Sequence, residues 1–184
     1  MKLEEICFED DAFKAAVLAT GFTEAEEVTE IRGRKQKIRS VKGLECFPNL
    51  KVLDLTRNRL SDIDLSGNPK LEQLFIGNNQ LESIDLSGLE ELEGLELFMN
   101  DIEELDLSHN KRLEVLYANA NDFSEIDLSA NTLLEEVQLD DNQLEKLVLP
   151  EPANFQKFTA CNNSLSEELI MDLKKQLTGC PVKL

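Results

Sequence analysis

The sequence repeats itself every 21 residues over most of its length. Five segments align without a gap, and they begin at Leu50, Leu71, Leu92, Leu113 and Leu134. A shortened sixth copy begins at Phe155, and a divergent copy that is one residue longer begins at Val28. Each head follows the pattern LxxLxLxxN or a close variant, as in "LEQLFIGNN". Repetition at a fixed period predicts a solenoid, in which each unit packs against its neighbours and the stack buries one continuous core.

A second copy of the same pattern lies about ten residues into most units, as in "LSDIDLSGN" and "IEELDLSHN". Ten residues less a turn are too few for a proper helix, but they suffice for a short strand. We therefore expect two short strands in each coil, little helix within the repeats, and a ladder of leucine and isoleucine between two thin sheets. The asparagines that end the heads should be buried and bonded to the backbone of adjacent coils. They are Asn58, Asn79, Asn100, Asn121, Asn142 and Asn163.

These heads resemble the LxxLxLxxN signature of leucine-rich repeat proteins, and the LDLS second halves resemble the nested, short-repeat subclass found in bacteria. The resemblance covers about residues 28–165. It implies a leucine-rich repeat solenoid that is mainly β, right-handed and gently curved, and that presents outward side chains from the first strand of each coil. It also implies a protein–protein interaction module without catalytic activity.

The 184 residues suit one domain with a single core. A solenoid exposes that core at both ends unless a cap covers it, so we expect a cap at each end. The expected parts are an N-terminal helical cap (1–27), a divergent first repeat (28–49), the 21-residue repeats (50–163) and a C-terminal helical cap (164–184).

Each cap has its own helix signals. Residues 9–20 carry apolar side chains at helical spacing after an acidic start, and Thr23 with Glu26 offers a capping box for a second short helix. The C-terminal helix should begin at Ser164 or Ser166 and end at Gly179.

The N-terminal cap and first repeat, from "DDAFKAAVL" to "GLECFPNL", resemble the caps of secreted leucine-rich repeat proteins of gut bacteria. Many of those caps carry a DxNxDG-type calcium loop. This chain has "ATGF" in its place, so we expect no calcium site there. The start "MKLEEICFEDD" shows no signal peptide, which predicts a cytoplasmic location. A secreted or cell-surface location is the alternative if the natural chain carries a leader.

Composition narrows the class of partner. Asp and Glu outnumber Lys and Arg by 37 to 19, and the net charge of −18 opposes nucleic-acid binding. No apolar run is long enough to predict membrane insertion. For Cys7, Cys46, Cys161 and Cys180 we favour buried thiols over two disulfides that clamp the ends. His109 is the only histidine, and no catalytic or metal-binding set can be assembled around it, so we expect neither an enzyme nor a cofactor.

The outward positions of the heads gather apolar side chains on one face. If the leucines and the asparagine of "LELFMN" point inward, Phe98 and Met99 face water side by side. Phe75 and Tyr117 occupy an outward position on the two adjacent coils. Clustered exposed aromatic residues are typical of binding hot spots, so we predict that these four residues bind a partner. The alternative is that Phe98 and Met99 fold over a coil edge or lie beneath a terminal loop.

Charge differs between the two ends of the same face. Its N-terminal part is basic, with Arg32, Arg34, Lys35 and Arg57, helped by Lys37 and Arg39. Its C-terminal part is acidic, with Glu136, Asp140 and Asp141, and Glu96 lies in the centre. We predict that a protein partner binds this face and is oriented by the charged zones, and the net charge of the chain fits a basic partner. The alternatives are an immunity or inhibitor protein that neutralises a basic toxin or effector, and a secreted internalin-like adhesin. We expect a monomer, or a weak homodimer joined through the apolar patches.

The second halves of the coils stack acidic residues, namely Asp64, Asp85, Asp106 and Asp127. Their repulsion is tolerable if the carboxylates are hydrated or bonded to adjacent backbone or serine groups. We favour a solvated face that resists aggregation. A site for a strongly basic partner or for divalent cations is the alternative.

Overall fold

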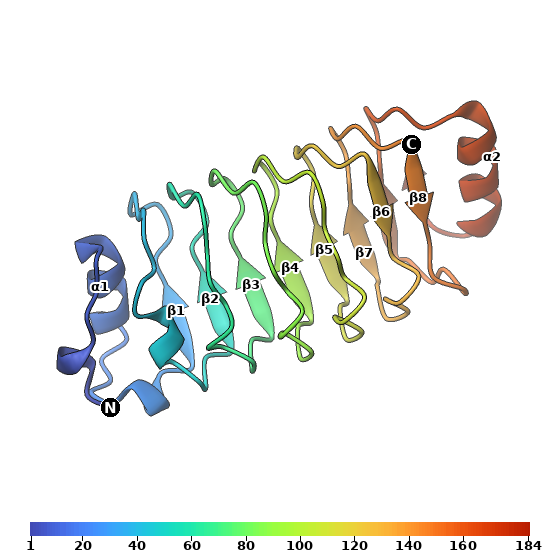
Figure 1. The fold of residues 1–184 in the computed structure, drawn as a ribbon. Helices are drawn as coiled ribbons and strands as arrows, with labels where there is room; N and C mark the ends of the chain where they lie inside the picture. Colours follow the sequence, from blue (N-terminus) through green and yellow to red (C-terminus); the bar gives the residue numbers. More distant parts are fainter.

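The computed structural model describes residues 1–184 and confirms the solenoid, an elongated stack of coils with a helix at each end (Figure 1). Eight parallel strands form one sheet in the order β1-β2-β3-β4-β5-β7-β9-β10. Seven of them come from the coil heads: β1 (Glu30–Arg32), β2 (Val52–Asp54), β3 (Gln73–Phe75), β4 (Gly94–Glu96), β5 (Val115–Tyr117), β7 (Glu136–Gln138) and β9 (Lys157–Thr159). The last, β10 (Val182–Lys183), follows the C-terminal helix and pairs with β9.

The repeat length sets the register of this sheet. Leu53 lies opposite Leu74, and Leu74 opposite Leu95, so each strand is paired with residues one repeat away. These three side chains are fully buried, as are most of the inward leucines and isoleucines of the other coils. The inward residues form one continuous cluster from the first cap to the last. The core is therefore a ladder, and each coil depends on its neighbours for burial.

The asparagine ladder has the predicted structural role. The side-chain amide of Asn100 donates to the carbonyl oxygens of Leu97 (2.9 Å) and Ile76 (3.2 Å), the latter in the preceding coil. Its Oδ1 accepts from the backbone N–H of Leu81 at 3.1 Å. Asn58, Asn79, Asn121, Asn142 and Asn163 make equivalent bonds. These bonds satisfy buried backbone groups at the turn and lock adjacent coils together.

The predicted second strand forms in only two coils. β6 (Glu125–Asp127) and β8 (Lys146–Val148) pair as a two-stranded parallel sheet. In the three preceding coils, residues 61–64, 82–85 and 103–106 make no backbone–backbone hydrogen bonds. The heads are already held by the large sheet and the asparagine ladder, so a coil can close without this second set of bonds. The expectation of two strands in every coil is wrong for these three coils.

The N-terminal cap begins with η1 (Leu3–Glu5) and continues into α1 (Asp11–Leu18), whose Phe13 and Val17 are buried against the first coil. The helix predicted over residues 9–20 is thus confirmed with slightly shorter ends. The capping box predicted at Thr23 and Glu26 is wrong. A 3-10 turn, η2 (Ala25–Glu27), follows Glu24, and no side chain caps it.

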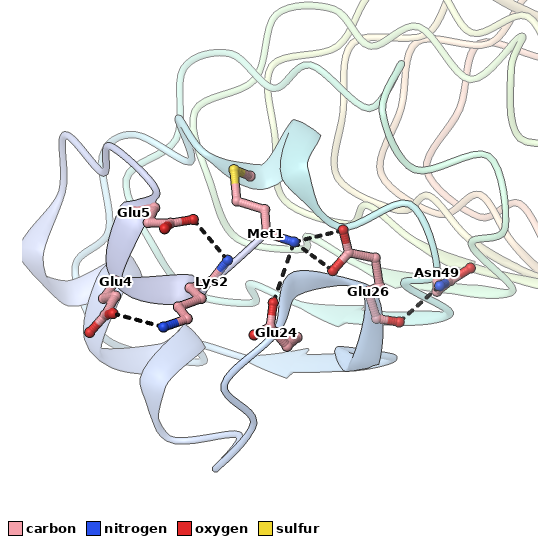
Figure 2. Close-up of polar contacts among 7 residues, drawn as sticks. All are labelled: Met1, Lys2, Glu4, Glu5, Glu24, Glu26 and Asn49. Carbon is pink, nitrogen blue, oxygen red and sulfur yellow. Dashed lines mark hydrogen bonds and ion pairs between the residues drawn. The ribbon is translucent and has the colours of Figure 1, made fainter.

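Glu26 is engaged elsewhere, as Figure 2 shows. Both of its carboxylate oxygens lie 2.8 Å from the amino group of Met1, which also lies 3.4 Å from Glu24. The backbone carbonyl of Glu26 accepts from the side-chain amide of Asn49 at 2.8 Å. Asn49 follows η3 (Leu44–Cys46), the turn that closes the first repeat. These contacts fasten the cap to that repeat.

The C-terminal cap matches the sequence prediction closely. α2 (Glu167–Gln176) starts after Ser166, whose hydroxyl accepts from the backbone N–H of Leu169 at 3.2 Å. Leu173 and Leu177 are buried, so the helix closes the last coil. Gly179 follows in the left-handed region with φ 98°, a conformation in which glycine is unstrained.

All four cysteines are free, so the end-clamping disulfides are absent. Cys7 is exposed and the other three are partly buried, which corrects the expectation that all four are buried. Burial raises the pKa of the Cys46 and Cys180 thiols above the ordinary value. Neither helix has the length and apolar character that crossing a membrane requires.

Candidate functional site

The sheet register brings one outward position of each head into a single row. In order from the N-terminal end, the row contains Arg32, Asp54, Phe75, Glu96, Tyr117, Gln138 and Thr159. The predicted site residues Phe75, Glu96 and Tyr117 are therefore direct neighbours on three adjacent strands. Each of the three is half-buried.

Phe98 lies just beyond β4 and leans across the neighbouring coil. A methyl group added to Gly77 would lie 2.5 Å from a carbon of the Phe98 ring, so the ring rests directly on the glycine backbone. Phe98 is half-buried as a result, and only Met99 of the four predicted apolar residues is well exposed, at 51%. The sulfur of Met99 accepts from the side-chain amide of Asn78 at 3.5 Å. The four apolar residues therefore expose less surface than four freely exposed side chains would.

Tyr117 gives the patch a polar edge. Its hydroxyl donates to Glu136 at 2.6 Å, and this hydrogen bond, followed by burial, raises the pKa of Tyr117 to about 12. The ammonium group of Lys157 lies 5.9 Å from the centre of the same ring, within range of a cation–π contact. The sequence analysis placed Glu136 in the acidic C-terminal part of the face, but it did not include Lys157. A signal for Lys157 was present, because it occupies the same outward position as Glu136, two residues before the row described above.

Glu96 is the charged residue at the centre of the row, between Phe75 and Tyr117. Its carboxylate makes no hydrogen bond and no ion pair, although Phe75 and Tyr117 flank it in the row. Burial raises the pKa of Glu96, the charge of Asp54 raises it further, and Arg34 opposes the shift. A half-buried carboxylate that lies between two aromatic residues and makes no ion pair favours the approach of an external cation.

The N-terminal end of the face is basic, as predicted. Arg32, Arg34 and Arg57 are exposed; Arg32 pairs with Glu30, whereas Arg34 and Arg57 make no ion pair. Residues 32–59 contain nine Lys or Arg and only two Asp or Glu, although the whole chain carries −18. Beside Arg32, a hollow of about 350 Å³ opens between α1 and β1 and is lined in part by Ala19 and Phe22. The sequence prediction did not include this hollow, because it depends on how the cap docks.

The acidic C-terminal end is less available than the sequence suggests. Asp140 is half-buried, and its two oxygens accept from the Thr159 hydroxyl (2.6 Å) and the Cys161 backbone N–H (2.7 Å). Asp141 is exposed and accepts from the side-chain amide of Asn162 at 2.7 Å. Both carboxylates thus bind the following coil, and Asp141 keeps more of its surface open to a partner. No three His, Cys, Asp or Glu side chains converge anywhere in the chain as a metal-binding group would.

Comparison with known proteins agrees with the fold. Residues 48–91 match the family model described as leucine-rich repeats in two copies. The functional domain of InlJ from Listeria monocytogenes, described as including a cysteine ladder, superimposes with a TM-score of 0.82 at 26% identity, over all of this chain and 43% of that one. Internalin C2 from the same organism superimposes with a TM-score of 0.76 at 22% identity, over 91% of this chain and 90% of that one. No curated protein matches the sequence of this chain.

The chain thus spans less than half of the InlJ structure. Its own cysteines do not form a ladder, since only Cys161 occupies a head of a repeat and the other three lie in or beside the caps. The leucine-rich repeat domain of APL1B also superimposes, with a TM-score of 0.71 at 20% identity, over 93% of this chain and 57% of that one.

Proposed function

Because this chain is a leucine-rich repeat protein of the bacterial type, we propose that it binds a protein partner through the outward face of its eight-stranded sheet. Leucine-rich repeat proteins generally bind other proteins and are generally not enzymes. The contact centre is the patch of Phe75, Phe98, Met99 and Tyr117, held rigid by the register of the strands. A preorganised face loses little conformational entropy on binding, so even a small patch can contribute strongly.

The environment of Glu96 is the observation that best supports this proposal. The partner places a lysine or arginine against the Glu96 carboxylate, between the rings of Phe75 and Tyr117. An ion pair there is partly shielded from water, and the flanking rings add a cation–π attraction. The half-burial of Glu96 without any internal partner supports this assignment, because an unpaired carboxylate in such a place destabilises the free protein.

The charged ends orient the partner. Arg34 and Arg57 attract acidic groups at one end, and Asp141 attracts basic groups at the other. Rim charges of this kind change the association rate and its salt dependence more than the final affinity. Arg32 contributes less, because Glu30 already neutralises it, and Asp140 contributes less because its oxygens are bonded within the solenoid.

The test is capture of a partner from a lysate of the source organism. Phe98→Ala/Tyr117→Ala should lose the captured protein, and Glu96→Gln should weaken capture by roughly tenfold, as loss of one partly buried charge pair implies. Leu133→Ala/Met171→Ala is the matched control, since Leu133 (52% exposed) and Met171 (58% exposed) lie outside the face. Capture that survives in the first variant, or that falls equally in the control, would exclude this face.

Two more specific roles remain as alternatives. The charge of −18 and the unpaired Glu96 favour an immunity or inhibitor protein that neutralises a basic toxin or effector. The likeness to InlJ and internalin C2 favours a secreted adhesin. A cleavable leader in the natural gene would decide for the adhesin, and co-purification of one basic partner at a fixed ratio would decide for the inhibitor. The solution mass separates either role from a homodimer that joins the apolar patches.

A further inference from the structure

A groove of about 640 Å³ runs across the second halves of four coils, away from the proposed binding face. Its floor is made of the inward-pointing side chains Ile84, Leu105 and Ile126. Ile126 is buried, but Ile84 and Leu105 are only half-buried. The groove lies where residues 103–106 make no backbone bonds to β6, so this part of the floor is not closed by strand pairing.

At one end of the groove, the residue type differs from that of the preceding repeats. The row Asp64, Asp85, Asp106 and Asp127 continues to Val148, the next residue at the same position, which is 47% exposed. An aliphatic side chain in a row of carboxylates extends the apolar floor toward the surface. Val148 therefore gives this end of the groove an apolar contact that an aspartate would remove.

The walls of the groove are acidic and stay charged. Asp106 and Asp127 accept from the backbone N–H groups of Ser108 (2.9 Å) and Ser129 (2.8 Å). Hydrogen bonds from these serines hold the pKa of both aspartates below the ordinary value, and this bonding is one of the conditions under which repulsion within the acidic row is tolerable. On the other wall, Lys146 lies 2.9 Å from Glu125 and neutralises it.

Glu104, the remaining wall carboxylate, makes no hydrogen bond or ion pair. Three of the four wall carboxylates, those of Glu104, Asp106 and Asp127, thus face the groove without a cation. A floor that is apolar and walls that carry net negative charge select an occupant with aliphatic and cationic side chains together.

We propose that this groove is a second binding site, and that it takes a short extended peptide segment in which lysine or arginine alternates with aliphatic residues. Successive side chains of an extended chain point to opposite sides, so the aliphatic residues enter the floor, and the long cationic side chains on the outer side bend back to the wall carboxylates. At a coil spacing of about 5 Å, four coils span roughly 15 Å, which matches four or five extended residues. The site is independent of the proposed function, because it shares no residue with the sheet face.

The test uses a synthetic octapeptide of alternating lysine and valine, titrated into the intact chain at low salt. Saturable binding is expected, and a lysine–serine octapeptide of equal charge should bind at least about fivefold more weakly, because it lacks aliphatic side chains. Glu104→Gln/Asp106→Asn should weaken the lysine–valine peptide by about fivefold, since two surface ion pairs are lost. Asp62→Asn/Asp64→Asn is the matched control, with the same change of charge in a coil outside the groove, and should change the affinity less than about twofold.

The Val148→Asp variant distinguishes docking in the groove from general electrostatic attraction of the peptide. This variant adds negative charge but removes the apolar contact, so docking in the groove predicts weaker binding, whereas non-specific attraction predicts stronger binding. Phe98→Ala/Tyr117→Ala should leave the peptide affinity unchanged, because both residues lie on the sheet face. The two proposals can therefore fail independently of each other. Absence of binding, equal binding of the lysine–serine peptide, equal effects of the two carboxamide variants, or tighter binding by Val148→Asp would each overturn the proposal.

Discussion

The packing of Phe98 depends on Gly77, whose lack of a side chain leaves room for the ring. Gly77→Ala should destabilise the protein by about 1–3 kcal/mol, because the new methyl group collides with the ring and forces it to move. In a Phe98→Ala background the same methyl group meets no ring, so its cost should fall below about 0.5 kcal/mol. Urea unfolding of the four proteins measures both values. Equal costs in the two backgrounds would mean that the ring does not rest on Gly77.

Glu96 should make stability depend on pH in the opposite sense to an ion-paired carboxylate. Its pKa is raised in the folded protein, above the ordinary 4.5, chiefly by burial and then by the charge of Asp54. The folded state therefore binds this proton more tightly than the unfolded state, and the ionised form destabilises the fold. The penalty is fully present above the folded pKa and is lost as the pH falls below 4.5.

Glu96→Gln removes the charge and should therefore be more stable than the natural protein at neutral pH. The difference should shrink as the pH falls through the raised pKa toward 4.5. Denaturation midpoints of the two proteins across this range measure it. A Glu96→Gln protein that is less stable at neutral pH would show that the carboxylate has an internal partner.

The sequence was enough to predict which side chains share the sheet face, because a period of 21 fixes the register of every head. It was not enough to predict how far each one is exposed. The tilt of Phe98 onto Gly77 depends on two residues in different coils, and the two bonds of Asp140 to Thr159 and Cys161 depend on side-chain geometry across coils. The pattern within one repeat predicts the direction in which a side chain points. The exposed fraction of that side chain depends on the neighbouring repeat.

Among the elements, α1 is fastened to the solenoid by Asp10. One carboxylate oxygen of Asp10 caps the helix at Ala12 (2.8 Å) and Phe13 (3.1 Å), and the other accepts from the Arg39 backbone N–H at 2.8 Å. Burial alone would raise the pKa of Asp10, but these backbone hydrogen bonds outweigh it and lower the pKa below 3.8. Such a group stabilises the fold above the unfolded pKa, and this stability is lost as the pH falls through the folded value.

Asp10→Ala should therefore cost about 1–2 kcal/mol at neutral pH, in the range of a lost helix cap. The cost should decline as the pH falls below 3.8, where the natural carboxyl group also becomes protonated. Thermal unfolding at neutral and acidic pH measures both. Ser166→Ala, which removes the cap of α2, is the control: its cost should not vary with pH in this range, because serine does not titrate.

The second halves of the coils show that a sequence pattern does not determine strand pairing. The second halves "LESIDLSGL" and "FSEIDLSAN" are close in sequence, yet only the latter contributes a paired strand, β6. Strand alternation determines which side chains point inward, and that prediction is sound in both coils, since Ile84 and Ile126 both contact the core. Pairing between coils depends on their spacing on that side of the solenoid, which no single repeat encodes. The groove proposed above follows from this difference.

At the scale of the whole molecule, charge is separated along the solenoid. Residues 32–59 carry a local excess of seven positive charges, while the complete chain carries −18, so the remaining residues carry a large negative excess. Several carboxylates repeat at the same position in successive coils, where they lie close to one another. Ion pairs between coils offset only part of this repulsion, for example Lys51 with Glu72 (2.6 Å).

Net repulsion predicts that added salt stabilises the folded protein. Raising sodium chloride from about 20 mM to about 300 mM shortens the screening length from roughly 20 Å to roughly 6 Å, which weakens repulsion between carboxylates of neighbouring coils. The free energy of unfolding in urea should then rise by about 1 kcal/mol. Tetramethylammonium chloride at equal ionic strength should give the same rise if screening is the cause, whereas a rise with sodium alone would indicate cation binding on the acidic row. A fall with both salts would mean that attractive pairs such as Lys51–Glu72 outweigh the repulsion between stacked carboxylates.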